Sequence, residues 1–147
     1  MNRIIRIIAV VVILAGGYLG AKYFGLIGGP AAMNADEVSA YLENMAKEIN
    51  EADGGLNYDD FSKLVSATHM GKQITIRGDS ILKTAQLDDG YIATREALAT
   101  DKLCSDEAAR AALAGGARFV YFWFSADNER IGGVDISGAD YCASKGR

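Results

Sequence analysis

The longest hydrophobic stretch of the chain lies at its start. Residues 4–27 are almost entirely apolar, and the charged side chains among them are Arg6 near one end and Lys22 near the other. A helix that crosses a bilayer needs about 20 mostly apolar residues, and long basic side chains near its ends can reach the headgroups. This pattern predicts that residues 1–27 form a single-pass membrane anchor, with membrane contact through residues 4–27.

The basic residues around this stretch predict its orientation. Arg3 and Arg6 outweigh Lys22, and the side richer in Lys and Arg stays in the cytoplasm. The protein is then a signal-anchor protein of the inner (cytoplasmic) membrane, with a glycine-rich linker at residues 28–33 and a periplasmic domain at residues 34–147. The alternative is a cleaved signal peptide, which would also export the domain but whose small-residue cleavage motif is imperfect here.

Beyond the linker, apolar residues recur with the period of a helix. Asn34 or Asp36 can cap the first turn, where the carboxylates of Asp36 and Glu37 suit the positive end of the helix dipole. Gly54-Gly55 provides a stop. Spacings of three and four predict one apolar stripe, which is formed by Val38, Tyr41, Leu42, Met45, Ile49 and Ala52.

Two later regions alternate with the period of a strand. Residues 63–77 are interrupted by Gly71-Lys72, whose glycine-first composition is typical of a two-residue type II′ turn, so this region predicts a hairpin. A second hairpin is predicted from the β-prone run at residues 118–124 and a strand at residues 131–137, with a bulge at Gly132-Gly133.

Two short helices at residues 91–102 and 105–115, or one helix bent around Cys104, are predicted between the hairpins. Ser105 is a favourable cap for the second helix, and Gly115-Gly116 is a favourable stop. The sequence therefore predicts an α+β fold. After the transmembrane helix, a small antiparallel sheet of two hairpins packs against two or three helices on one face.

Length and charge restrict the class of partner. The chain has 147 residues. The part that remains without the anchor is long enough for one hydrophobic core but not for two. Residues 34–147 carry 12 bases and all 19 acids. Such a domain lacks the basic footprint that nucleic acid or an anionic lipid surface requires. Its charge instead favours a protein partner with a basic surface.

The two cysteines, Cys104 and Cys142, stand before a predicted helix and after the last predicted strand. In an oxidising periplasm such a pair is most simply a structural disulfide. The pair lacks the C-x-x-C spacing of a redox catalyst, and the single histidine of the chain leaves too few ligands for a zinc site. We therefore expect a disulfide, no metal and no cofactor.

A pattern of apolar, glycine and cysteine positions fills the C-terminal part of the chain. It consists of Leu103-Cys104-Ser105-Asp106, Leu113, Gly115, residues 119–122, Asp127, residues 131–136 and Asp140-Tyr141-Cys142. This pattern resembles small exported proteins of Gram-negative bacteria with a C-terminal disulfide. Some of these are similar in layout to pilotins, which assist secretin channels. The resemblance implies an envelope location and the disulfide but transfers no functional residues, and the chain lacks the lipidated cysteine of a pilotin.

Candidate catalytic groups are few. His69 is the single histidine, but a Ser–His–Asp arrangement needs a positioned nucleophile, and no G-x-S-x-G motif is present. The acid pairs Asp59-Asp60 and Asp88-Asp89 could bind a cation or act as general acid and base. Adjacent carboxylates usually point apart, and Asp88-Asp89-Gly90 is favourable turn composition without any function.

The run RFVYFWF at residues 118–124 places aromatic side chains on both faces of its strand. We expect Tyr121 and Trp123 on the open face as partner-binding residues, because their rings carry polar groups and are common at binding hot spots. We expect the purely apolar set in the core. That set is Val120, Phe122 and Phe124.

These features favour a membrane-anchored periplasmic module that acts by protein–protein contact and is not an enzyme. An immunity protein or an exclusion protein fits the anchor, the acidic domain and the disulfide. One alternative is a pilotin-like accessory protein of a secretion system. Another is a small periplasmic hydrolase that uses His69 with nearby acids.

Overall fold

The structure is a computed structural model that describes residues 31–147. The predicted anchor at residues 1–27 and the first half of the linker, residues 28–30, lie outside the described residues. Within residues 31–147, no helix combines the length and the apolar composition that a membrane span requires. The elements in chain order are α2 (Ala35–Glu51), β1 (Leu56–Asp59), β2 (Ser62–Met70), β3 (Gln73–Ser80), the 3-10 helix η2 (Thr84–Gln86), α3 (Tyr91–Ser105), α4 (Glu107–Ala114), β4 (Arg118–Phe124), β5 (Arg130–Ser137) and α5 (Tyr141–Ser144).

Helix α2 forms where its cap and apolar stripe predict it. The Asn34 side-chain oxygen accepts hydrogen bonds from the backbone N–H groups of Asp36 and Glu37, both at 3.0 Å. The Glu37 carboxylate accepts in return from the Asn34 N–H at 3.0 Å, which completes a capping box. The predicted stripe is buried along most of its length, so the helix is held by its apolar face.

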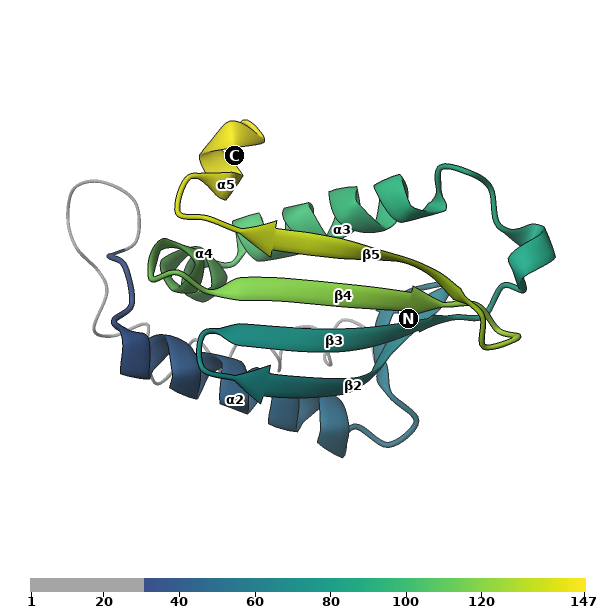
Figure 1. Ribbon diagram of the computed structural model, residues 1–147, viewed down its shortest axis with the longest axis horizontal. Coiled ribbons are helices and arrows are strands. Elements are labelled where there is room, and N and C mark those ends of the chain that lie inside the picture. Colours follow the sequence, from purple (N-terminus) through teal and green to yellow (C-terminus); the bar gives the residue numbers. More distant parts are fainter. Residues whose placement is uncertain (1–30) are drawn as a thin grey trace, which may run out of the picture.

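The sheet has five strands in the order β1-β2-β3-β4-β5. The predicted hairpins are present, because β2 pairs with β3 and β4 pairs with β5 in antiparallel fashion. The prediction of a wholly antiparallel sheet of two hairpins is wrong, since β3 and β4 are parallel and β1 adds a fifth strand. The chain leaves β3 at one end of the sheet and returns through α3 and α4, so β4 starts at the same end as β3 (Figure 1).

Local turns set the register of the hairpins. Gly71 between β2 and β3 has a φ of 59°, and Lys72 is not among the residues with positive φ, as a type II′ turn requires. The register of β5 slips between Gly132 and Arg130, beside the predicted bulge. A second slip, between Leu64 and Ser66, was not evident from the sequence.

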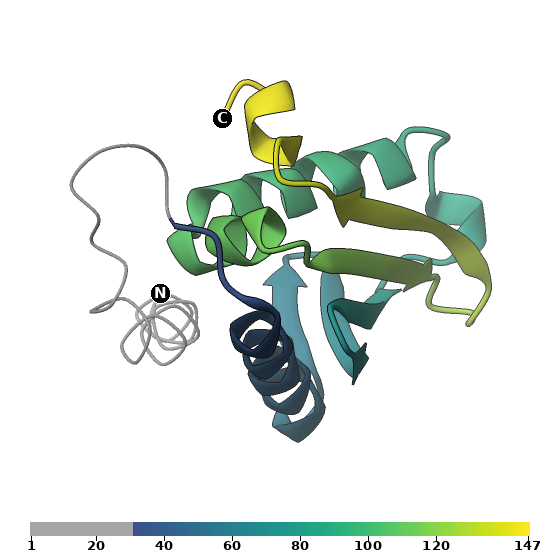
Figure 2. The same ribbon diagram turned by 60° about the vertical axis from the view of Figure 1, so that its left-hand side comes forward.

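Within residues 31–147, the helices that pack on the sheet all lie on one of its faces (Figure 2). The strands cross in front of α2 and α3 in Figure 1, and the turned view in Figure 2 shows α2 beside β2 and β3, with α3 and α4 nearer β4 and β5. We call the opposite side, which none of the described helices covers, the open face. The core lies between the helices and the sheet, and its largest fully buried side chains are Trp123, Phe119, Leu42, Ile74, Ile76, Leu113, Ile136 and Val38.

Candidate partner-binding face

The predicted orientation of strand β4 is reversed in the structure. Tyr121 is 4% exposed and Trp123 is fully buried, so neither lies on the open face and neither is available to a partner. The side chains on the open face are instead Val120, Phe122 and Phe124, each of them half-buried. The expectation that Tyr121 and Trp123 bind a partner is therefore wrong.

The orientation of β4 is reversed because the neighbouring strand, β3, leaves space for a large side chain on its core side. Gly78 of β3 stands beside Trp123 of β4, and a Cβ on Gly78 would lie 2.2 Å from the Trp123 ring. The indole therefore occupies the volume that a side chain at position 78 would need. Tyr58 closes the pocket, with its ring centroid 5.3 Å from that of Trp123. Burial also raises the pKa of the Tyr121 hydroxyl, so this ring enters the core as the neutral phenol.

Two arginines cover the aromatic side chains of the open face. The Arg77 guanidinium lies 4.2 Å from the centre of the Phe124 ring, and the Arg130 guanidinium lies 4.3 Å from that of Phe122. Arg77 is fixed by hydrogen bonds of 2.7 Å to the Asp79 carboxylate and to the Asn128 side-chain oxygen. These contacts hold the Arg77 guanidinium over the Phe124 ring, and Arg130 makes the same kind of cation–π contact with Phe122.

A third arginine, Arg118, lies at the start of β4, at the opposite end of that strand from Phe124. Arg118 donates to the carboxylate of Asp135 on β5, which stands opposite Val120 and so lies diagonally across the open face from Arg118. Hydrogen bonds from Arg118 lower the pKa of Asp135, although partial burial opposes this. Both groups are about half exposed, so we assign the pair a role in fixing the surface rather than in stability.

The large apolar residues that are most exposed also occupy open-face positions. Met70 is 80% exposed and stands opposite Gln73, which alternates with the core residues of β3. Phe61 and Ile81 are 52% and 59% exposed. The Ile81 N–H donates to the Phe61 carbonyl at 2.9 Å, which extends the β2–β3 ladder by one pair. Strand alternation then directs both side chains to the open face.

The charge of the open face is opposite to that of the rest of the domain. Its strand positions carry four bases and two acids, whereas the remainder of residues 34–147 carries eight bases and seventeen acids. The open face is therefore a basic surface on an acidic domain. Its charged residues are Lys63, Arg77, Arg118, Arg130, Asp79 and Asp135.

The turn between β4 and β5 supports this face. Asp127 accepts hydrogen bonds from the Ser125 hydroxyl at 2.5 Å and from the Thr84 N–H at 3.1 Å. These bonds lower the pKa of Asp127 to about 2. Asn128, which follows, has a φ of 62° and reaches Arg77. The acidic turn is thus a scaffold that positions one of the arginines.

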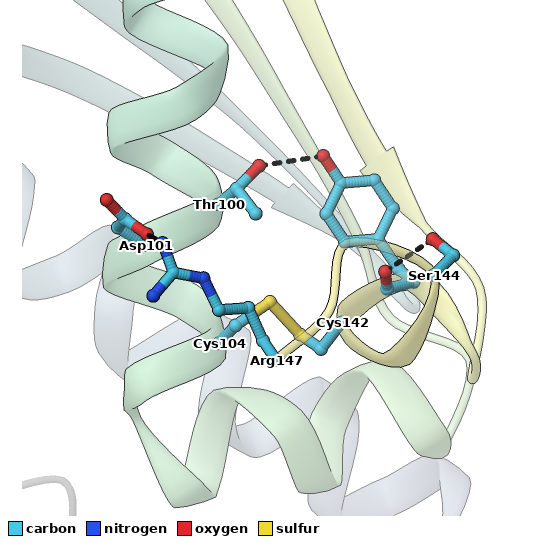
Figure 3. The surroundings of a disulfide bond; sticks show 7 residues. Thr100, Asp101, Cys104, Cys142, Ser144 and Arg147 are labelled. Carbon is cyan, nitrogen blue, oxygen red and sulfur yellow. Dashed lines mark hydrogen bonds and ion pairs between the residues drawn. A yellow bond between two sulfur atoms is a disulfide. The ribbon is translucent and has the colours of Figure 1, made fainter.

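The predicted disulfide is present. Cys104 at the end of α3 is joined to Cys142 in α5, with the two Cα atoms 5.5 Å apart (Figure 3). The Thr100 and Tyr141 hydroxyls are hydrogen-bonded at 2.9 Å, and Arg147 pairs with Asp101. The C-terminal segment is therefore fastened to α3 by a covalent bond and by polar contacts beside it.

A shallow hollow lies between α3 and this C-terminal segment. Its volume is about 380 Å³, and small side chains such as Ala93 and Ala97 form part of its wall. The charged groups around it are already paired, Lys145 with Glu96 and Arg147 with Asp101. These ion pairs fasten the C-terminal residues to α3. They leave none of these four charged groups unpaired at the hollow.

His69 does have a hydroxyl neighbour. Its Nε2 atom lies 3.0 Å from the Ser39 hydroxyl oxygen and 3.0 Å from the Gly71 carbonyl oxygen. A carbonyl can only accept, so the bond to Gly71 requires a proton on Nε2, and that nitrogen is then unable to take a proton from Ser39. The geometry gives the hydrolase interpretation no support.

The two acid pairs predicted as candidate sites, Asp59-Asp60 and Asp88-Asp89, do not form a common site. Asp59 accepts from the buried Arg95, which also donates to the Ser62 hydroxyl at 2.8 Å. Burial of Asp59 opposes its ionisation, but hydrogen bonds from Ser62, Phe61 and Arg95 hold its pKa below the usual value. Asp88 and Asp89 lie in an exposed turn. Within residues 31–147, no three potential ligands are grouped as a metal ion would require.

Comparison with known proteins shows similarity at the level of fold. No protein-family model matches the chain, and comparison with curated proteins by sequence gave no match. A solved structure of a Pseudomonas aeruginosa protein inferred to be secreted matches with a TM-score of 0.58. That protein is 21% identical, and the match covers 76% of this chain and 98% of the other.

Two pilotins have a similar fold. The pilotin of the Vibrio vulnificus type 2 secretion system matches with a TM-score of 0.53 and 12% identity, over 74% of this chain and 90% of its own. The type II secretion system pilotin of Vibrio cholerae matches with a TM-score of 0.51 and 12% identity, over 74% of this chain and 94% of its own. The pilotin-like layout expected from the sequence is confirmed, and the likeness is one of fold.

Proposed function

We propose that this protein is an accessory protein of a secretion system, similar in role to a pilotin, that acts by binding another protein. The observation that carries the proposal is the match in fold to two type II secretion pilotins over at least nine-tenths of their length. The open face supports it independently. Half-buried Phe122 and Phe124 beside exposed apolar residues form the kind of surface that marks a protein–protein contact.

The proposal includes a location. A disulfide between Cys104 and Cys142 suits an oxidising compartment such as the periplasm. We further propose that residues 1–27 hold the protein in the inner membrane, so that residues 34–147 reach their partner in the periplasm. An immunity or exclusion protein would share this location, but no comparison adds support for that role.

Deletion of the gene from its source bacterium tests the proposal. We expect release of secreted substrates into the medium to fall and the secretin subunit to accumulate in the inner-membrane fraction instead of the outer. The full chain supplied on a plasmid should restore both. The control is a strain that lacks the secretin itself, which sets the level of complete failure. Unchanged secretion together with unchanged secretin distribution would contradict the proposal.

A further inference from the structure

We infer that the open face binds a protein segment whose apolar side chains are flanked by carboxylates. The inference rests on the proposed function only in taking a protein as the partner. The chemistry of the segment follows from the apolar and basic side chains of the open face.

The apolar part of the segment would meet a surface that the domain leaves uncovered. Phe61 and Ile81 stand at the end of the β2–β3 ladder near Phe124, and each exposes more than half of its side chain to water. Residues 31–147 contain three large apolar residues that are this exposed, and the third, Met70, is also at an open-face position but at the opposite end of the β2–β3 ladder. Covering them removes apolar area from water, at roughly 25 cal/mol per Å².

The carboxylates would meet Arg130. Among residues 31–147, no acid forms an ion pair with Arg130, whose guanidinium is exposed above the Phe122 ring. A guanidinium stacked on a ring still has its in-plane N–H groups, which match the two oxygens of a carboxylate. Arg77 lies over Phe124 from the other side of β4, but its N–H groups already donate to Asp79 and Asn128, so Arg130 is the arginine that a carboxylate would reach first.

The distribution of charge favours such a segment over other partners. A basic segment, which the net charge of the domain alone would favour, would here face four bases and two acids. An anionic lipid surface would be attracted to these bases, but it would also approach the strongly acidic remainder of the domain within a few Debye lengths. An acidic protein segment is narrow enough to contact the face alone.

Calorimetric titration of the purified full chain with two matched peptides tests the inference. The first is a 16-residue peptide of Leu, Phe and Glu, and the second has Lys in place of every Glu. We expect the Glu peptide to bind at least about tenfold more tightly, with an affinity that falls as salt is added. Arg130→Glu should weaken binding of the Glu peptide about tenfold. Arg147→Glu, the same charge change away from the face, should alter it less than about twofold.

The double variant Phe61→Ser with Ile81→Ser tests the apolar part. It should weaken binding of the Glu peptide while leaving the melting temperature unchanged, because both side chains are exposed in the free protein. Failure of both peptides to bind, equal binding of the two peptides, or an Arg130→Glu variant that binds normally would each overturn the inference. So would vesicles of phosphatidylcholine and phosphatidylglycerol that displace the Glu peptide from the wild-type chain where vesicles of phosphatidylcholine alone do not.

The outcomes also separate this inference from the proposed function. If the gene deletion leaves secretion intact but the peptide preference holds, the open face binds acidic segments in a different process. If secretion fails on deletion but the peptides do not discriminate, the accessory role stands and the partner binds by other means.

Discussion

Replacement of Gly78 by alanine should destabilise the domain by steric conflict with one side chain. The added Cβ would lie 2.2, 2.4 and 2.7 Å from three atoms of the Trp123 ring. The ring is fully buried, stacked on Tyr121 and packed against Tyr58, so it has little space to move. The backbone of Gly78 does not have positive φ, so alanine causes no strain there beyond this conflict.

The expected magnitude follows from two opposing terms. Overpacking of a core costs about 1–3 kcal/mol, and three close contacts with an immobile ring place Gly78→Ala near the upper end. Loss of glycine flexibility in the unfolded chain returns about 0.4–1 kcal/mol. The free energy of unfolding should therefore fall by about 2 kcal/mol, which for a domain of this size lowers the melting temperature by roughly 6–10 °C.

Guanidinium denaturation of the oxidised protein measures this loss, with far-UV circular dichroism as the signal. The control is Gly90→Ala, where the nearest atom to the new Cβ is 3.4 Å away. That variant should stay within about 0.5 kcal/mol of wild type. In a Trp123→Leu background the cost of Gly78→Ala should largely disappear. A Gly78→Ala protein as stable as wild type, or an equal cost in the Trp123→Leu background, would refute the steric argument.

Three further predictions concern the disulfide, the faces of β4 and the acidic turn. Thiol labelling of denatured, unreduced protein should detect no free sulfhydryl, and the pair Cys104→Ser with Cys142→Ser should lose roughly 3–4 kcal/mol of unfolding free energy in denaturant titrations. Trp123→Ala should cost about 3–5 kcal/mol and Phe124→Ala clearly less, since Phe124 is half-buried; the reverse order would mean that the faces are wrongly assigned. The pKa of Asp127 is lowered to about 2, so its contribution to stability is complete above pH 3.8 and is lost as the pH falls through 2. The difference in unfolding free energy between wild type and Asp127→Asn should accordingly shrink over that interval, and a difference independent of pH would contradict the assignment.

Features that depend on neighbours in the sequence could be predicted. The cap at Asn34 and the stripe behind it define α2, and Gly71 defines the hairpin turn between β2 and β3, because each signal is contained within a few residues. The Cys104–Cys142 bond was also predictable, since the two cysteines of the chain leave one pairing.

Features that depend on distant pairing could not be predicted in this way. Polarity alone favoured Tyr121 and Trp123 for the open face, but the available volume is decided by Gly78, about 45 residues earlier in the chain. Gly78 becomes informative only once β3 and β4 are known to be parallel. The open-face arginines were missed for the same reason, because Arg77 and Arg130 meet the β4 aromatics across strands. The signal that the sequence offered was Gly78 itself, because a glycine inside a strand pattern often marks a site where another part of the chain approaches closely.

The parallel contact between β3 and β4 divides the chain into two parts that each contain helix and antiparallel strands. The exposed turn at residues 88–90 lies on the connection between them. Neither part can cover its own apolar surface, because Ile74 and Ile76 of one pack in the same core as Phe119 and Trp123 of the other. Each fragment of a chain cut in that turn should therefore fold only in contact with the other, so fragments fused to two other proteins would report when those proteins come together.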